Sequence, residues 1–174
     1  MLHYCFKMLY HLGIGSNLRE REANLFKCRT LLQEKETVVV SSSALYETEP
    51  VGIKEQPWFL NQALAIETKQ LPLELLDEIK YIERRMGRVS AEIGGPRLID
   101  IDILLAGDEV VVHERLLIPH PRLTERNFAL IPLAEIAPTA IHPLQMQTIQ
   151  QLKEACSDTS VVRPYFKQDS NSGD

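Results

Sequence analysis

The sequence contains no apolar run that approaches the ~18–20 residues of a membrane-spanning helix. Residues 1–8 are too short and too interrupted by polar side chains to predict a signal peptide. The three cysteines, Cys5, Cys28 and Cys156, are odd in number and widely spaced, which indicates neither a disulfide framework nor a metal-binding cluster. These absences predict a cytoplasmic protein with free thiols and no membrane partner.

The sequence also lacks an excess of positive charge. Its 19 lysines and arginines are outnumbered by 24 aspartates and glutamates, so the formal net charge is −5. A general nucleic-acid-binding protein usually carries a basic face, and we therefore expect no nucleic-acid partner. A local cluster of arginines can still bind an anionic small molecule against this overall charge.

No internal repeat or low-complexity linker divides the chain. Its 174 residues, with 44% hydrophobic side chains, suit one domain with an ordinary core. We expect a single domain over residues 1–174, ordered over 8–165, with flexible ends at 1–7 and 167–174. We also expect a monomer that binds small molecules.

Apolar periodicity and turn residues predict the element order β-α-β-β-α-β. The predicted elements are a strand at 8–14, a helix at 18–34, strands at 37–46 and 58–68, a helix at 72–86 and a strand at 98–105. This order is typical of an α+β, ferredoxin-like sandwich, and we expect the first and fourth strands at the sheet centre with both helices on one face. Later residues add a hairpin from Gly107-Asp108 into 110–112, and helices at 125–136 and 148–155.

A third glycine is missing where a dinucleotide-binding fingerprint would need it. Gly13 and Gly15 supply half of such a motif, and a tight turn from strand to helix explains them better. Ser16 or Asn17 is then expected to cap the following helix.

Two acids alternate with large aliphatic residues in the last predicted strand of the β-α-β-β-α-β unit. Alternation places Asp100 and Asp102 on one face, and Ile99, Ile101 and Ile103 on the other. Paired carboxylates suit a hard cation such as Mg²⁺, which keeps water and phosphate oxygens as further ligands. The same alternation is typical of an edge strand with a solvated acidic face, so the two acids alone do not decide between these interpretations.

Cations surround the two acids in the sequence. The segment 87–128 contains Arg88, Arg97, Arg115, His120 and Arg126. Each of these residues alone is typical of a surface or a turn. Together with two carboxylates they are the parts that phosphoryl transfer needs, since arginine forks can offset the negative charge that builds on phosphate oxygens.

Three segments resemble the signature of the 6-hydroxymethyl-7,8-dihydropterin pyrophosphokinase family. They are Gly95-Pro96-Arg97-x-x-Asp100-x-Asp102, Ile118-Pro119-His120-Pro121-Arg122 and Arg126-x-Phe128. Segments 13–18, 46–52 and 56–61 are similar to the family's first turn, pterin-side loop and third strand, and the resemblance covers residues 9–155. It implies an enzyme that transfers pyrophosphate from ATP to the hydroxymethyl group of the dihydropterin, releasing AMP, in folate synthesis.

The resemblance also implies roles for individual residues. Asp100 and Asp102 would hold two Mg²⁺ ions, and Arg88 and Arg97 would join them in catalysis. The implied ATP contacts are Glu83, Arg97, Ile103, Arg115, His120 and Arg126. The implied pterin contacts are Thr48, Val51, Phe59, Asn61 and Phe128.

The chain departs from the family just before the Gly-Pro-Arg motif. Many members carry an Arg-Trp pair where this chain has Ile93 and Gly94, and a second loop arginine is replaced by Ser90. We expect the loop 88–94 to close over both ligands all the same. Two alternatives are a ferredoxin-like module that binds RNA or protein, and a relative that binds ligands without turnover. An RNA-binding module should show stacking aromatics and a basic sheet face, in place of two acids.

Overall fold

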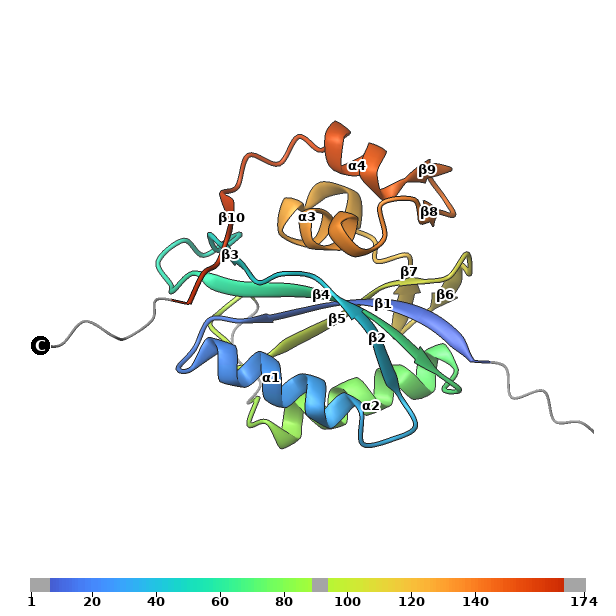
Figure 1. Ribbon diagram of the computed structural model, residues 1–174, viewed down its shortest axis with the longest axis horizontal. Helices are drawn as coiled ribbons and strands as arrows, with labels where there is room; N and C mark the ends of the chain where they lie inside the picture. The colour runs from blue at the N-terminus through green and yellow to red at the C-terminus, as the bar shows by residue number, and fades with distance from the viewer. Residues whose placement is uncertain (1–6, 89–93, 168–174) are drawn as a thin grey trace, which may run out of the picture.

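The computed structural model describes residues 7–88 and 94–167, and an antiparallel sheet runs through its middle (Figure 1). The strands of this sheet are β1 (Met8–Ser16), β2 (Val38–Ser42), β3 (Tyr46–Thr48), β4 (Phe59–Thr68), β5 (Asp100–Ala106) and β10 (Val162–Pro164). Their order is β10-β3-β4-β1-β5, and β2 also pairs with β4. β1 therefore lies between β4 and β5, and it pairs with both in antiparallel register.

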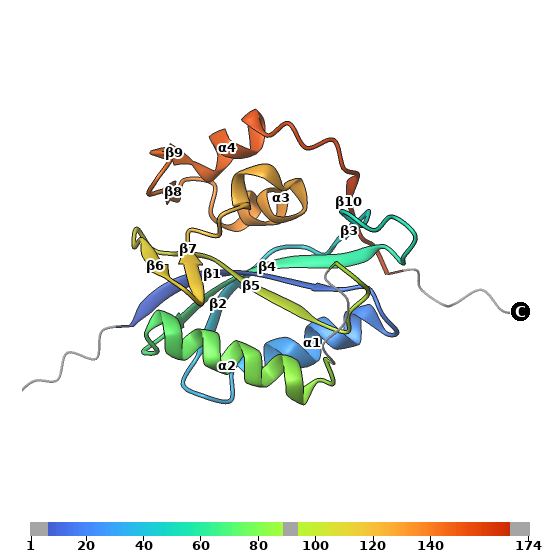
Figure 2. The ribbon, with the colours of Figure 1, turned by 180° about the vertical axis from the view of Figure 1, so that it is seen from behind.

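Helices cover both faces of the sheet, as Figures 1 and 2 show from opposite sides. The helices α1 (Arg21–Leu32) and α2 (Pro72–Arg85) lie on one face, and α3 (Asn127–Ile136) and α4 (Ile149–Ala155) lie on the other. Each layer encloses its own apolar cluster. No helix of the described ranges, 7–88 and 94–167, is long and apolar enough to cross a membrane.

The predicted elements are present, and α1 and α2 share one face as expected. The predicted second strand is divided into β2 and β3, with a bulge between Val39 and Ser41. One expectation was wrong, because β5 lies at the end of the strand order and not at the centre of the sheet. An edge strand that is covered on one face carries the same alternation as a central strand, so the pattern could not separate the two positions.

The hairpin predicted at Gly107-Asp108 was also wrong. Gly107 turns the chain with a φ of +55°, but β6 (Val111–His113) pairs forward with β7 (Leu116–Ile118) and not back onto β5. A second small hairpin joins β8 (Ile141–His142) to β9 (Gln147–Thr148). A short 3₁₀ helix, η1 (Leu123–Glu125), precedes α3.

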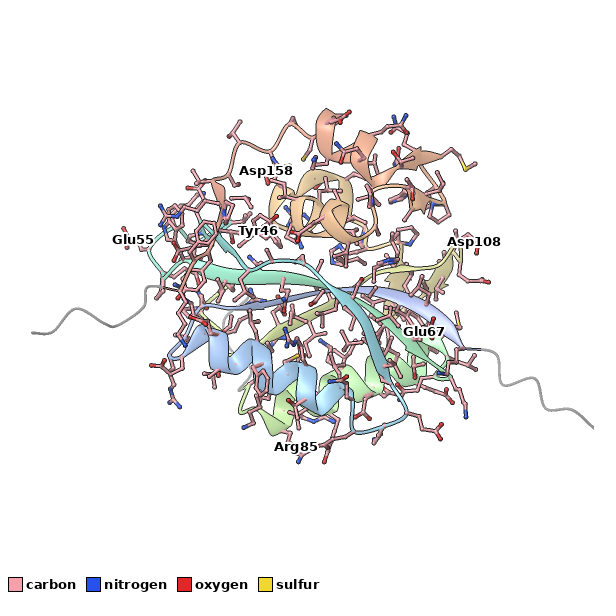
Figure 3. The ribbon with its side chains drawn as sticks, in the orientation of Figure 1. Tyr46, Glu55, Glu67, Arg85, Asp108 and Asp158 are labelled. Carbon is pink, nitrogen blue, oxygen red and sulfur yellow. The ribbon has the colours of Figure 1, made fainter. Side chains whose placement is uncertain are left out.

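The strand β10 near the C-terminus was not predicted. It is only three residues long and ends in a proline, so no alternation is visible in the sequence. It pairs with β3, and Arg163 donates to Glu47 Oε2 at 2.6 Å. From the same strand β3, Tyr46, which is labelled in Figure 3, donates to Glu135 Oε2 of α3 at 2.7 Å. The chain end and α3 therefore both hold β3 in place.

Candidate active site

A cavity of about 700 Å³ lies between the sheet and α3. Its lining comes from β1, β4, β5, the loop after β3, the start of α3 and the segment 120–126. Residues of α2 and its following turn, Lys80 and Arg88, also reach it. The cavity thus collects side chains from segments that are far apart in the sequence.

The acidic pair lies on the cavity face of β5. Asp100 and Asp102 line the cavity, whereas Ile101 and Ile103 are buried in the core under α1 and α2. The predicted division of this strand into two faces is therefore confirmed. Arg88 donates to Asp100 Oδ1 and Arg97 donates to Asp100 Oδ2, each at 2.9 Å.

Asp102 has a different environment from its neighbour. Burial, together with the nearby negative charge of Asp100, raises the pKa of the Asp102 carboxyl to about 6. A carboxylate with a raised pKa beside a second carboxylate is stabilised by an added cation. A bound cation would therefore stabilise the charged form of both carboxylates.

Glu83 of α2 lies behind the acidic pair and holds its neighbours by hydrogen bonds. Its side chain is buried, and its Oε1 accepts the backbone N–H of Ile101 at 3.1 Å. Oε1 also accepts from Arg88, while Oε2 accepts from Lys80 Nζ at 2.9 Å. Glu83 therefore fixes the backbone of β5 and holds two cations that line the cavity, although it is not itself part of the lining.

A second group of basic residues comes from the segment before α3. The His120 N–H donates to Leu104 O at 3.0 Å, which attaches this segment to β5. Burial and the nearby Arg126 lower the pKa of His120 to about 4, so its imidazole is neutral at pH 7. The Nε atom of Arg126 is buried and makes no hydrogen bond within the part of the chain that the structure describes. An anionic oxygen at this place would supply the missing acceptor.

The opposite side of the cavity carries neutral and aromatic groups. Asn61 Nδ2 donates to Thr48 Oγ1 at 2.7 Å, and both residues are buried. Phe59 lies under the Arg97 guanidinium, with 5.8 Å between Cζ and the ring centroid. Phe128 lies under Arg126 in the same way at 5.5 Å. Val51 also lines the cavity.

Besides Glu83, two predicted site residues are absent from the cavity lining. The Ile103 side chain is buried among the core residues on the opposite face of the sheet. Arg115 lies in the turn between β6 and β7, where it forms an ion pair with Asp77 of α2. The predicted loop 88–94 falls mostly on residues 89–93, which lie outside the described residues.

Asn17 does not line the cavity, but it supports the site in a way that sequence reasoning missed. The helix α1 begins only at Arg21, so Asn17 is not its cap. Its Nδ2 donates to Gln56 Oε1 at 3.0 Å and to Pro57 O at 2.9 Å, and its Oδ1 accepts the Arg97 N–H at 2.8 Å. Asn17 thereby joins the segment before β4 to the segment before β5.

Two cations in the lining, Lys80 and Arg122, were also not assigned a role. Lys80 lies one helical turn before Glu83, and this i, i+3 spacing was the available signal. Arg122 lies two residues after His120, beyond Pro121, and its backbone N–H donates to His120 Nδ1 at 3.1 Å.

The acidic pair fits a magnesium ion but not a closed metal cage. Within residues 7–88 and 94–167 there is no group of three or more His, Cys, Asp or Glu side chains that could hold a metal. Mg²⁺ is commonly bound by one or two carboxylates plus waters and substrate phosphates. Asp100 and Asp102 at an open cavity supply that donor set.

Comparisons with known proteins agree on one family. The family model for 7,8-dihydro-6-hydroxymethylpterin-pyrophosphokinase matches residues 11–138. The chain is 44% identical over 127 residues to 2-amino-4-hydroxy-6-hydroxymethyldihydropteridine pyrophosphokinase of Bacillus subtilis, covering 72% of this chain and 76% of that protein. It is 41% identical over 143 residues to the Aquifex aeolicus protein of the same name, covering 82% and 89%.

A solved structure resembles the fold. The crystal structure of Plasmodium falciparum HPPK-DHPS A437G with STZ-DHP aligns with a TM-score of 0.69 at 18% identity. The alignment covers 88% of this chain and 46% of that one, so this chain spans less than half of that protein's length. At this identity the likeness supports the arrangement of helices and sheet alone.

Proposed function

The chain belongs to the 7,8-dihydro-6-hydroxymethylpterin-pyrophosphokinase family, and we propose that the cavity between the sheet and α3 is its active site. The enzyme transfers the pyrophosphoryl group of ATP to the hydroxymethyl oxygen of 6-hydroxymethyl-7,8-dihydropterin, in folate synthesis. The hydroxyl oxygen bonds to the β-phosphorus, the bond from that phosphorus to the α-phosphate oxygen breaks, and AMP leaves. The hydroxyl proton is released in the same reaction.

The observation that carries this assignment is the division of the cavity by β1. β4, with Asn61, pairs with one edge of β1, and β5, with Asp100 and Asp102, pairs with the other. A flat, neutral heterocycle suits the first side, because aromatic rings and amide groups can hold its faces and edges. A polyphosphate suits the second side, where cations and acids gather.

The pterin contacts that we propose are Thr48, Val51, Phe59, Asn61 and Phe128. Asn61 offers an amide oxygen and nitrogen to the edge of the heterocycle, and the Thr48 hydroxyl holds that amide in one orientation. Phe59 and Phe128 are placed to contact the ring faces. All five residues line the cavity.

On the phosphate side, Asp100 and Asp102 would hold two Mg²⁺ ions, which when bound would supply positive charge against the negative charge of the phosphate groups. Arg88 and Arg97 would move from Asp100 to phosphate oxygens as the ligand enters. Arg126 would donate its free Nε, and neutral His120 would donate or accept a hydrogen bond without adding charge. Glu83 and Arg115 complete the proposed ATP set, with Glu83 acting through Arg88 and β5. Ile103 could contact ATP only through its backbone, because its side chain is buried on the other face of the sheet.

A product assay tests this function. The purified chain, given ATP, Mg²⁺ and 6-hydroxymethyl-7,8-dihydropterin, should form AMP and the pterin diphosphate in equal amounts. No AMP should form when the pterin or Mg²⁺ is omitted. Formation of ADP would point to transfer of one phosphoryl group, and binding of both ligands without turnover would identify a relative that has lost activity.

We also propose the ferredoxin-like arrangement for the sheet and a single-domain, cytoplasmic monomer for the chain. If β2 and β3 count as one interrupted strand, the order β3-β4-β1-β5 reads second, third, first, fourth. A split arrangement of two β-α-β units has its first and third strands at the centre, so the edge position of β5 supports it, although β5 was expected at the centre. Sedimentation at micromolar concentration would test the monomer.

A further inference from the structure

Two glycines of β1 lie between the pterin side and the phosphate side of the cavity. In the sheet register, Gly15 is opposite Asn61 on β4 and opposite Asp100 on β5. Gly13 is opposite Ala63 and Asp102. Both glycines line the cavity, so β1 contributes bare backbone at these two positions. These are the two glycines of the incomplete dinucleotide-binding motif, which the sequence alone assigns to a tight strand-to-helix turn.

The two glycines differ in what a side chain would meet. A Cβ atom built on Gly15 would lie 2.3 Å from Asn61 Oδ1, which is much closer than any ordinary contact. A Cβ atom built on Gly13 would meet only the Leu104 side chain, at 3.5 Å, which is ordinary van der Waals contact. Neither glycine has the positive φ that would exclude alanine for backbone reasons. Space is therefore the only structural demand that separates them.

The Asn61 amide occupies the space that Gly15 leaves open. Its nitrogen is held by Thr48 Oγ1 at 2.7 Å, so the direction of the oxygen follows from that bond. Asn61 is 8% exposed, and it also borders the cavity. A methyl group at position 15 would have to rotate the amide away and break its bond to Thr48.

We propose that Gly15 is a positioning residue for pterin recognition, because its missing side chain lets the Asn61 amide lie across β1 in the orientation that Thr48 holds. Gly15 acts through Asn61 and does not itself recognise the substrate. The inference rests on the proposed assignment of Asn61 to the pterin. It adds a specific requirement at a residue that carries no functional group.

The test compares Gly15→Ala with Gly13→Ala as a matched control in the full chain. Gly15→Ala should raise KM for 6-hydroxymethyl-7,8-dihydropterin at least tenfold, while the Kd of a non-hydrolysable ATP analogue with Mg²⁺ changes less than twofold. Gly13→Ala adds the same methyl group to the cavity lining without meeting Asn61, and it should raise the pterin KM much less than Gly15→Ala does. A fall in nucleotide affinity as large as the loss at the pterin would indicate general damage to the sheet and would overturn the proposal.

A double-mutant cycle separates this inference from the proposed function. Asn61→Ala alone should raise the pterin KM, and adding Gly15→Ala to it should have no further effect, because the displaced amide is already gone. An unchanged pterin KM in Asn61→Ala would overturn the proposed pterin site. A strong effect of Asn61→Ala combined with wild-type behaviour of Gly15→Ala would overturn only the role of Gly15.

The cycle also covers the case in which Gly15→Ala does not fold. Removing the Asn61 amide removes the atom that the new methyl group would meet. The double variant Gly15→Ala with Asn61→Ala should then recover a cooperative thermal transition. A double variant that stays unfolded would show that position 15 needs glycine for a reason unrelated to Asn61, and it would overturn the proposal.

Discussion

The two sides of the cavity are built by different physical means. On the pterin side, the buried Asn61 and Thr48 form a neutral hydrogen bond between adjacent strands. On the phosphate side, Asp100 is bound by Arg88 and Arg97, and Arg88 is also bound by Glu83. The first side is already arranged for a ligand. The second side consists of charges that satisfy one another until a ligand replaces some of them.

This difference indicates how each substrate would bind. A heterocycle can enter the pterin side without breaking an ion pair, so its affinity should depend on shape and on the direction of the Asn61 amide. A polyphosphate must draw Arg88 and Arg97 away from Asp100. An incoming cation at Asp100 and Asp102 would make this exchange easier, because it takes over the charge that the arginines now offset. Nucleotide binding should therefore depend strongly on Mg²⁺, whereas pterin binding should not.

The largest effect is expected from removing the acidic pair. Asp100→Ala and Asp102→Ala should each lower kcat for AMP formation by a factor on the order of 10³, because the cation that offsets developing phosphate charge loses a ligand. Each variant should keep a cooperative thermal transition, since both side chains lie on the cavity face of β5. Initial rates of AMP release at saturating substrates measure the effect.

Asn61→Ala is the matched control for these variants, because it removes a cavity side chain from the other side. It should affect the pterin KM and leave the Mg²⁺ dependence of nucleotide binding unchanged. AMP release at the wild-type rate in either aspartate variant would contradict the proposed magnesium ligands. The assignment of the β5 side of the cavity to the phosphates would then be wrong.

A smaller effect is expected on stability without ligands, through the raised pKa of Asp102. The folded pKa, about 6, is above the ordinary value of 3.8, so the folded chain binds this proton more tightly than the unfolded chain does. The stabilisation is complete below about pH 4 and is lost as the pH rises through about 6. Relative to Asp102→Asn, the wild type should therefore lose on the order of 2 kcal/mol of unfolding free energy between these limits.

Urea unfolding with a metal chelator, at several pH values across this range, measures the difference between the two chains. Comparing the two chains cancels the other carboxyls, some of which titrate in the opposite sense. The pKa of Glu47, for example, is lowered by its hydrogen bond to Arg163. If the unfolding free energies of wild type and Asp102→Asn change in parallel with pH, the pKa of Asp102 is not raised in the folded chain.

The sequence predicts which face of a strand is buried better than it predicts which strands pair with each other. The alternation at 99–103 predicts which side chains of β5 face the core, and burial in the structure agrees. It cannot predict that β5 lies at the sheet edge, since one covered face produces the same pattern in either position. Gly87, with a φ of +91°, follows the end of α2 as predicted because that requirement is local.

In the site, too, the sequence predicts local features but not which distant segments meet. The motif around Asp100 and Asp102 predicts that cations and acids gather, and the cavity brings together Arg88, Arg97 and both acids. The function of Asn17 could not be predicted in this way. Asparagine before a helix usually indicates a cap, but its partners here lie 39, 40 and 80 residues away along the chain. Only the folded chain determines which of its possible partners it meets.

Asn17 joins the segment before β4 to the segment before β5, and it gives the third prediction. Asn17→Ala should lower the unfolding free energy by about 1–2 kcal/mol, because it removes part-buried side-chain hydrogen bonds to the Pro57 carbonyl and the Arg97 N–H. It should also raise KM for both substrates several-fold, since it frees Gln56 on one side and Arg97 on the other. Steady-state kinetics with each substrate varied in turn, and urea unfolding, measure the two effects.

Asn24→Ala is the matched control for Asn17→Ala. Asn24 is also an asparagine with side-chain hydrogen bonds, at 3.0 Å to Ser16 and 2.9 Å to Leu18, but these bonds join α1 only to the end of β1 and the turn between them. It should cost a similar free energy of unfolding and leave both KM values unchanged. A change confined to one substrate in Asn17→Ala would mean that the two sides are held independently.

The smallest effect is expected at Arg115, which tests how far the phosphate side extends. Arg115 and Asp77 are 49% and 62% exposed, and exposed ion pairs of this kind contribute at most about 1 kcal/mol, so Arg115 can leave Asp77 for a nucleotide. Arg115→Ala should raise KM for ATP by only about threefold with kcat unchanged. Asp77→Ala frees the same arginine and should leave KM for ATP equal or lower. If neither variant alters KM for ATP, the phosphate side is confined to the cations that line the cavity. Nucleotide binding must then depend on the movement of Arg88 and Arg97 away from Asp100, without a contribution from the β6–β7 turn.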